Sequence, residues 1–139
     1  MTGDARRDEE GSVLLLTLGY VLLALAAVWV CVSATDLYLA QKRVDAVADA
    51  ASLAGADGFA IVLGDGTVLA ELTDDAVRIQ AAAILDAHPG DVHLVEASAP
   101  DGTSARVTVS ALWHPPLFSP LIPDGLLLRA TATTRTALQ

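Results

Sequence analysis

The feature that most constrains this chain is an uncharged, strongly apolar run from Ser12 to Thr35. As an α-helix, the run would extend about 36 Å, because each residue adds about 1.5 Å. That length is sufficient to cross the hydrocarbon core of a bilayer, which is about 30 Å thick. We therefore predict a transmembrane helix over residues 12–35, preceded by a short cytoplasmic tail over residues 1–11.

A cleaved secretory signal is the main alternative to a retained anchor. Val32 and Ala34 are the small residues that signal peptidase would need, and the mature chain would then begin at Thr35. However, the apolar core exceeds the roughly 7 to 15 residues of a signal peptide, and the tail before it is acidic. A lipoprotein signal that ends at Cys31 is disfavoured, because the bulky Trp29 lies just before that cysteine. We favour the anchor.

The basic residues that set membrane topology are balanced on the two sides of the run. Arg6 and Arg7 precede it, and Lys42 and Arg43 follow it, so the positive-inside rule gives no preference. We expect the N-terminus to be cytoplasmic and the C-terminal domain to be extracytoplasmic. The second basic pair lies two turns farther from the run, and the short tail is harder to translocate than to retain.

The helix is predicted to continue beyond the membrane as an amphipathic stalk over residues 36–56, because the first following glycine is Gly55 and the first proline is Pro89. Small and apolar residues recur in it at spacings of three and four, which is typical of a helix-packing stripe. The stripe packs either on the chain's own small domain or on a neighbouring copy or partner helix, and the sequence leaves both open. Its residues are Leu37, Ala40, Val44, Val47, Ala51 and Ala54.

Residues 57–139 predict a small α+β head with one helix and a three-stranded antiparallel sheet. A hairpin is expected around the turn dipeptide at Asp65 and Gly66. Thr73 has the character of an N-cap for a helix over residues 74–87, with its apolar face inward. Alternating residues then predict three strands, and the proline-rich residues 114–125 predict an irregular connection. The expected inward residues are Val77, Ala81, Ile84 and Leu85 in the helix, Val92, Leu94 and Glu96 in the first strand, and Val107, Val109, Ala111 and Trp113 in the second.

Catalytic and nucleic-acid-binding functions find no support in the residue pattern. The chain has a formal net charge of −9, and 13 acidic residues against 6 basic ones follow Thr35, which opposes binding to phosphate backbones. The histidines His88, His93 and His114 lack the spacing and companion ligands of a metal site. We therefore expect no enzyme activity, no cofactor, no metal ion and no nucleic-acid partner.

The order of these segments resembles TadE/TadG-like proteins of the tight-adherence (Flp-type) pilus machinery. The resemblance is carried by the acidic tail that ends at Gly11, the apolar helix, and the stretch from Leu37 to Ala56 with its basic pair and the motif DAVADAA. It implies a bacterial inner-membrane protein that works with other pilin-like subunits. Some such proteins are cut after a glycine and carry a glutamate five residues into the mature chain. If Gly11 were that glycine, the mature chain would begin at Ser12 and Leu16 would replace the glutamate, which disfavours processing.

We therefore expect a membrane-anchored, non-enzymatic, pilin-like component of Flp-type pilus or secretion-system assembly, whose stripe from Leu37 to Ala54 contacts other pilin-like subunits. Its expected partners are the lipid bilayer, other pilus-assembly membrane proteins and further copies of itself. The alternative is a small secreted binding domain that is released by cleavage after Ala34.

Overall fold

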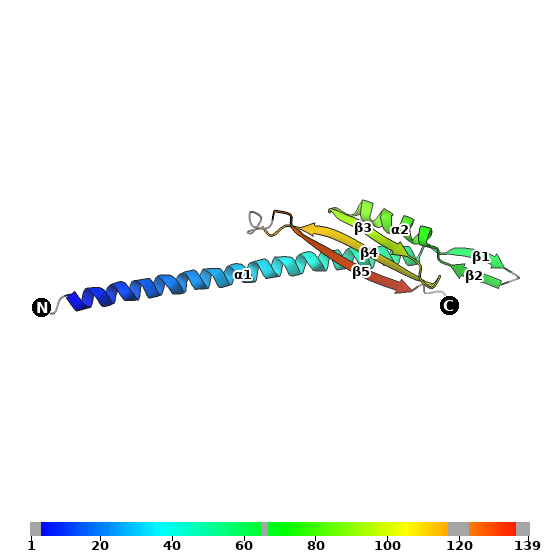
Figure 1. The fold of residues 1–139 in the computed structure, drawn as a ribbon. Coiled ribbons are helices and arrows are strands. Elements are labelled where there is room, and N and C mark those ends of the chain that lie inside the picture. Colours follow the sequence, from blue (N-terminus) through cyan, green and yellow to red (C-terminus); the bar gives the residue numbers. More distant parts are fainter. Residues whose placement is uncertain (1–3, 65–66, 117–122, 136–139) are drawn as a thin grey trace. The chain divides into compact units, whose positions relative to one another are not determined.

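A computed structural model describes residues 4–64, 67–116 and 123–135, and of residues 4–10 and 62–70 it describes the backbone alone. Contacts divide the chain into two compact units, Met1–Asp36 and Leu37–Gln139. Helix α1 (Asp4–Ala56) contributes residues to both units, and the second unit also contains a further helix and all of the described strands (Figure 1). The predicted α+β fold, with one long apolar N-terminal helix followed by a helix and a three-stranded antiparallel sheet, is confirmed.

Helix α1 is 53 residues long, and its sequence contains no proline that would interrupt the backbone hydrogen bonds. It ends where the sequence supplies consecutive small and polar residues. The amide of Asp57 donates to the carbonyl of Leu53 at 3.2 Å, and the amide of Gly58 donates to the carbonyl of Gly55 at 3.2 Å. These bonds satisfy carbonyl groups that would otherwise lack partners in the last turn.

Helix α2 (Asp74–Ala87) forms as local sequence signals predict. The Thr73 hydroxyl accepts a hydrogen bond from the amide of Ala76 at 3.3 Å, and acidic residues occupy the first turn, where they complement the helix dipole. His88 caps the other end, directly before a Pro-Gly pair. Of the four residues predicted to face inward, Val77 and Ala81 are fully buried, and Ile84 and Leu85 pack against the core.

A separate two-stranded sheet precedes α2. Strand β1 (Ala60–Gly64) pairs antiparallel with strand β2 (Thr67–Glu71), which confirms the predicted hairpin strands. The turn predicted at Asp65 and Gly66 lies outside the described residues.

The larger sheet is an antiparallel meander in the order β3 (Val92–Ser98), β4 (Ser104–Trp113) and β5 (Leu126–Arg135). Residues 117–122 of the predicted irregular connection between β4 and β5 lie outside the described residues.

One strand prediction is wrong, because β3 contains a bulge. The register with β4 shifts between Leu94 and Glu96, so the strict alternation predicted from the sequence fails after Leu94. A bulge adds one residue to one strand and moves the following side chains to opposite faces. Glu96, predicted to point inward, is therefore exposed, and Ala97 is buried instead.

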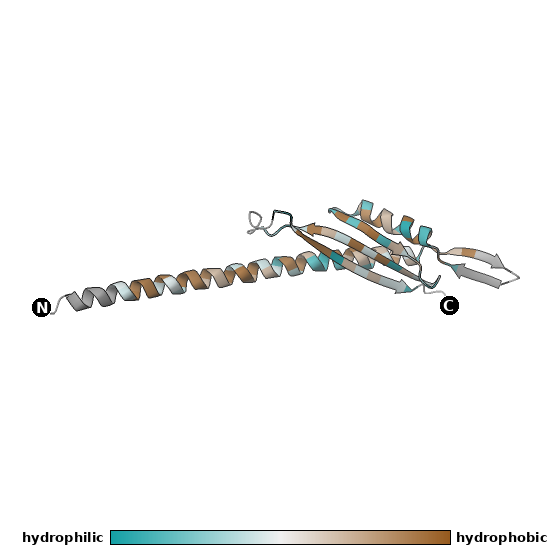
Figure 2. Cartoon of the chain, viewed as in Figure 1, coloured by the Kyte–Doolittle hydropathy of each residue, from teal (hydrophilic) through white to brown (hydrophobic). Residues whose placement is uncertain are grey.

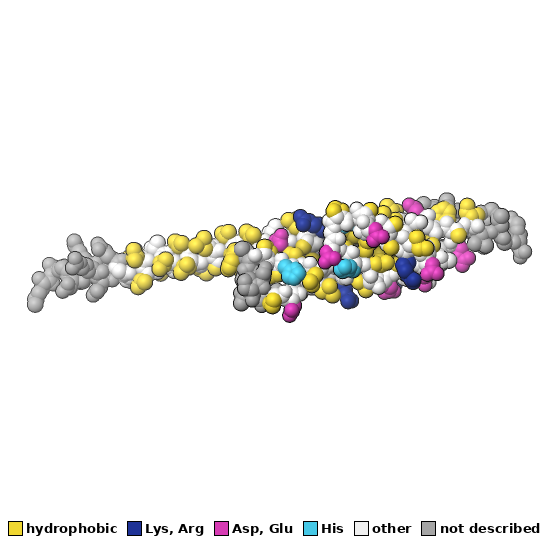
Figure 3. Space-filling view, turned by 90° about the horizontal axis from the view of Figure 1, so that it is seen from above, with side chains coloured by type: hydrophobic (Ala, Val, Ile, Leu, Met, Phe, Trp, Pro, Cys, Tyr) yellow, Lys and Arg dark blue, Asp and Glu magenta, His cyan; other side chains and the backbone are white. Residues whose placement is uncertain are grey.

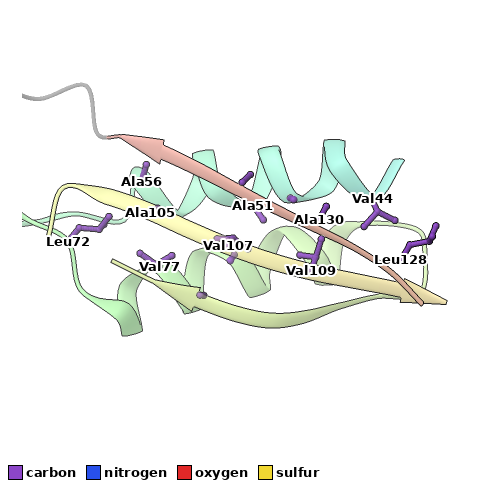
Figure 4. Close-up of a cluster of buried hydrophobic side chains, with 14 residues drawn as sticks. Val44, Ala51, Ala56, Leu72, Val77, Ala105, Val107, Val109, Leu128 and Ala130 are labelled. Atoms are coloured by element: carbon purple, nitrogen blue, oxygen red, sulfur yellow. The ribbon is translucent and has the colours of Figure 1, made fainter. Parts of the chain in front are cut away.

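The core of the second unit lies between the sheet and the two helices. Figure 4 shows Val44 and Ala51 from α1, Val77 from α2, and Val107 and Val109 from β4 pointing into this layer. The inward alternation predicted for β4 is confirmed by the full burial of its two valines. On β5, every second residue from Leu128 to Ala132 is buried, as a half-buried antiparallel strand requires.

Candidate membrane-spanning and helix-packing surfaces

The apolar run of α1 exposes its side chains along the whole length that the structure describes. All of its large apolar residues are exposed, for example Leu15 at 69% and Val30 at 62%. Figure 2 shows this part of α1 as predominantly hydrophobic, and Figure 3 shows no charged side chain on its described residues. The helix is long and apolar enough to cross a membrane, as predicted.

Two hydroxyl groups within the run bond to the helix itself. The Thr17 hydroxyl donates to the carbonyl of Val13 at 2.8 Å, and the Thr35 hydroxyl donates to the carbonyl of Cys31 at 2.9 Å. Hydrocarbon offers no hydrogen-bond partner, so a threonine is tolerated there when its hydroxyl is satisfied internally. These two threonines are therefore compatible with a lipid environment.

A small polar network marks the first turns of the second unit. The Gln41 amide nitrogen donates to the Asp45 carboxylate at 2.9 Å, and the Lys42 ammonium donates to the same carboxylate at 3.2 Å. These two bonds lower the pKa of Asp45, and the same carboxylate raises the pKa of Lys42. The Lys42 ammonium also lies 5.8 Å from the centre of the Tyr38 ring. This cluster is mostly exposed, so its contribution to stability is small.

Most of the predicted helix-packing stripe packs on the chain's own core. Val44 and Ala51 belong to the core cluster, and Leu37 and Ala40 pack against it. Ala54 is half-buried, and Val47, at 5% exposure, lines a cavity together with Ile84 of α2. In the structure, most of the stripe therefore packs on the chain's own domain, and its expected contact with other pilin-like subunits stays a prediction.

The buried face of α1 is broader than the predicted stripe. Ala48, Ser52, Gly55 and Ala56 are also buried, although the predicted stripe does not include them. They recur at spacings of three and four, and every one is small, which allows α1 to approach its neighbours closely. The sequence signal for this broader buried face is the row of small residues beside the stripe. It was missed because alanines also occupy the exposed side of this helix, for example at Ala50.

Gly55 lies where α1 closely approaches α2 and β4. A Cβ at this position would lie 2.9 Å from Cγ1 of Val77 and 3.3 Å from Cβ of Ala105. Real Cβ atoms do not tolerate the shorter distance without movement of a neighbour. Glycine here therefore allows α1, α2 and β4 to meet without steric conflict.

Two side-chain contacts fix how α1 runs beside β5. The Gln41 amide nitrogen donates to the backbone carbonyl of Arg129 at 3.0 Å, and the hydroxyls of Ser52 and Thr134 lie 2.7 Å apart. The separation between the two contacts is 11 residues along the helix and 5 along the strand. At about 1.5 Å and about 3.4 Å per residue, both separations are about 17 Å. The helix and the strand therefore run in the same direction, and the two contacts are separated by the same distance along each of them.

The connection between β3 and β4 is organised by Asp101. Its carboxylate accepts hydrogen bonds from the amides of Thr103 and Ser104, at 3.0 Å and 2.6 Å, and from the Ser104 hydroxyl at 2.9 Å. These bonds lower the pKa of Asp101 to about 2. Arg135, at the end of β5, lies 3.7 Å from the same carboxylate. The turn and the last strand are thus joined at one anionic group.

The candidate processing positions all lie within α1. Gly11, Ser12, Ala34 and Thr35 are exposed, and nothing lies within 4 Å of a Cβ placed on Gly11. Cleavage at either point stays a prediction.

The histidines do not converge on a common site. His93 pairs with Asp91 at 3.1 Å, and His88 lines an open cavity of about 230 Å³ beside Arg43 and Trp113. Among the residues that the structure describes, no three or more His, Cys, Asp or Glu side chains are grouped to hold a metal ion.

No curated protein and no solved structure matches this chain. Residues 11–58, in contrast, match the family model for Flp pilus-assembly TadE/G-like proteins. The matched stretch begins where the apolar run begins and ends two residues beyond α1, so it includes both the exposed apolar helix and the helix that packs on the sheet. The resemblance predicted from the sequence is therefore confirmed over residues 11–58, where this chain is similar to TadE/G-like proteins.

Proposed function

We propose that this chain is a single-pass, membrane-anchored and non-enzymatic component of an Flp-type pilus or of a related secretion-system assembly. Its N-terminus is cytoplasmic, and the unit Leu37–Gln139 is extracytoplasmic. The observation that carries the proposal is the match over residues 11–58, because it includes an exposed apolar helix that has the length of a membrane span.

The division of α1 between two roles supports this proposal. From Ser12 to Thr35 its side chains are mostly apolar and largely exposed, and a soluble protein rarely exposes so much continuous apolar surface. From Val44 onward, the same helix supplies buried side chains to a packed core. In this account, residues 1–11 are the cytoplasmic tail, 12–35 the membrane span, 36–56 the stalk helix, and 57–139 complete the head.

Because the sheet already covers most of the stripe, we propose that contact with other pilus components also uses surfaces outside it. We propose that the partners are other pilin-like or pilus-assembly membrane proteins, including further copies of this chain. The exposed apolar run can pack against neighbouring transmembrane helices, and small residues such as Gly19 and Ala26 allow close approach.

Paired charged substitutions test the anchor. Replacing Leu22 and Leu25 with arginine places two charges near the middle of the run, each of which costs about 3 kcal/mol on insertion. The matched control replaces Ile61 and Ile79, which are equally exposed apolar residues of the head, with arginine. We expect only the first pair to release the chain from membranes and to abolish its co-purification with pilus-assembly proteins. Full membrane retention of the first pair would contradict the proposal.

A second candidate function, a secreted binding domain, is favoured by the position of the unit boundary. Cleavage after Ala34 would leave the whole of Leu37–Gln139 intact, including the part of α1 that packs on the sheet. The intact mass of C-terminally tagged protein separates the two functions. A chain that begins at Thr35 and is found in the medium supports the secreted domain, and a chain that keeps the apolar run in the membrane supports the anchor.

A further inference from the structure

The sheet face opposite the two helices exposes a large apolar side chain on each of its three strands. Leu112 on β4 lies opposite Leu127 on β5 in the strand register, and the two are 48% and 53% exposed. On β3, the bulged Val95 is 47% exposed, while Leu94 and Ala97 take the inward positions before and after it. A sheet face that stays in water normally carries polar residues. We call this face of β3, β4 and β5 the open face.

The open face also carries charges of both signs, on different strands. Glu96 is on β3, Arg106 is on β4 and Arg129 is on β5, and all three are exposed. Glu96 lies opposite Thr108, which in turn lies opposite Thr131. Within the described part of the chain, none of the three charged groups has a partner in an ion pair. Their charges are therefore free to complement another molecule.

The acidic and basic groups lie toward opposite edges of the open face. β3 and β5 are the outer strands of the sheet, so their backbones are about 10 Å apart. Arg129 is also two residues, or about 7 Å, from the residue of β5 that is level with Glu96. The side chain of Arg106 is directed toward β5, because its Nε donates to the Thr133 hydroxyl at 3.4 Å. The open face therefore has an acidic edge at β3 and a basic edge at β5.

A second copy related by a two-fold axis parallel to β4 complements this arrangement. Such an axis places β3 of one copy over β5 of the other, so that each acidic edge meets a basic edge. It also places Leu112 against Leu112 of the other copy, with Leu127 beside this contact. Antiparallel sheets pack face to face in this aligned manner, with about 10 Å between them.

We propose that the open face is an interface between two copies of this chain, whose sheets pack face to face. The inference deepens the proposed function, in which further copies are partners, and it rests on the proposed anchor. The open face measures about 14 Å across the strands and about 30 Å along them, or about 400 Å² per copy. A standard interface has about 800 Å² per partner, so the contact is weak between free molecules and forms between copies that one bilayer concentrates.

Thiol cross-linking of the full chain in lipid vesicles tests the contact. In a Cys31→Ser background, which removes the single native thiol, Leu112→Cys places one thiol on the middle strand of the open face. The matched control is Ile79→Cys, which is 67% exposed on α2, on the other side of the sheet. Alkaline extraction first establishes that the chain is integral to the vesicles, and a short bis-maleimide is then added at one protein-to-lipid ratio. We expect cross-linked dimers with Leu112→Cys and only the background of random collisions with Ile79→Cys.

Charge reversals in the Leu112→Cys protein test the proposed pairs. Glu96→Arg and Arg129→Glu should each lower the dimerisation constant about tenfold, because each brings like charges together at two symmetry-related positions. The double variant exchanges the two charges and should restore cross-linking, as should an equal mixture of the two single variants. Asp86→Arg, an exposed reversal on α2, is the control and should leave cross-linking unchanged.

The outcomes separate this inference from the anchor on which it rests. Equal cross-linking of Leu112→Cys and Ile79→Cys would overturn the inference and leave the anchor intact, as would a double variant that cross-links as weakly as the single variants. A chain that alkaline extraction releases from the vesicles would overturn the anchor and, with it, the inference.

Discussion

Gly55 provides a sharp quantitative test of how α1 packs in the head. Replacing a helical glycine with alanine normally stabilises a helix by up to about 1 kcal/mol, because alanine restricts the unfolded backbone more. At this position, however, the added Cβ would lie 2.9 Å from Cγ1 of Val77, whose side chain is fully buried. A β-branched residue in a helix has little rotamer freedom with which to move away.

Overpacking of this kind costs about 1–3 kcal/mol. After subtraction of the helix-propensity gain, we expect Gly55→Ala to lower the free energy of unfolding of the head by about 1 kcal/mol. In a Val77→Ala background, the conflicting methyl group is absent and the remaining contact, with Cβ of Ala105, is 3.3 Å. There, Gly55→Ala should be neutral or stabilising, which gives a coupling energy of about 1–2 kcal/mol between the two positions.

The assay is chemical denaturation of the full chain in detergent micelles, followed by near-ultraviolet circular dichroism. The four proteins of the cycle are compared with Gly19→Ala, because nothing lies within 4 Å of a Cβ on Gly19 and the head should be unaffected. If Gly55→Ala stabilised the wild-type protein as much as it stabilises Val77→Ala, α1 would not approach α2 and β4 in the way described.

Three other substitutions have defined expected outcomes. Val44→Asp buries a charge in the core and should destabilise the head by at least about 2 kcal/mol, whereas Ala50→Asp, on the exposed side of α1, should change it little in the same denaturation assay. Thr73→Ala removes the N-cap of α2 and should cost about 1 kcal/mol, measured in the same way. The lowered pKa of Asp101 means that its hydrogen bonds stabilise the fold above the usual carboxyl pKa of 3.8, and that this contribution is lost as the pH falls through about 2. The difference in unfolding midpoint between wild type and Asp101→Asn should therefore shrink over that range, and a constant difference would contradict the assignment.

The elements that the sequence predicted well are those whose signals are local. The bounds of α2 follow from the cap at Thr73, its inward apolar residues and the Pro-Gly pair after His88. The uncharged run likewise predicts an exposed apolar helix from its own residues. In both cases, the residues that determine the structure lie within a short stretch of the sequence.

The predictions that failed or stayed open depend on partners distant in sequence. The bulge after Leu94 arises from pairing between β3 and β4, so alternation within β3 placed Glu96 on the wrong face. The stripe on α1 is equally suited to its own sheet and to a neighbouring helix, because alanine and valine pack in both settings. The close approach at Gly55 also involves α2 and β4, and a lone glycine near a helix end does not reveal it.

Protease accessibility of the head in spheroplasts tests the central claim most directly. The chain carries a C-terminal tag and is followed by immunoblot after alkaline extraction of the membranes. The account predicts a full-length tagged chain that resists extraction and loses its tag when protease is added to intact spheroplasts. A tag that is protected until the spheroplasts are lysed, or a shorter chain that leaves the membrane, would contradict an anchored protein with an extracytoplasmic head.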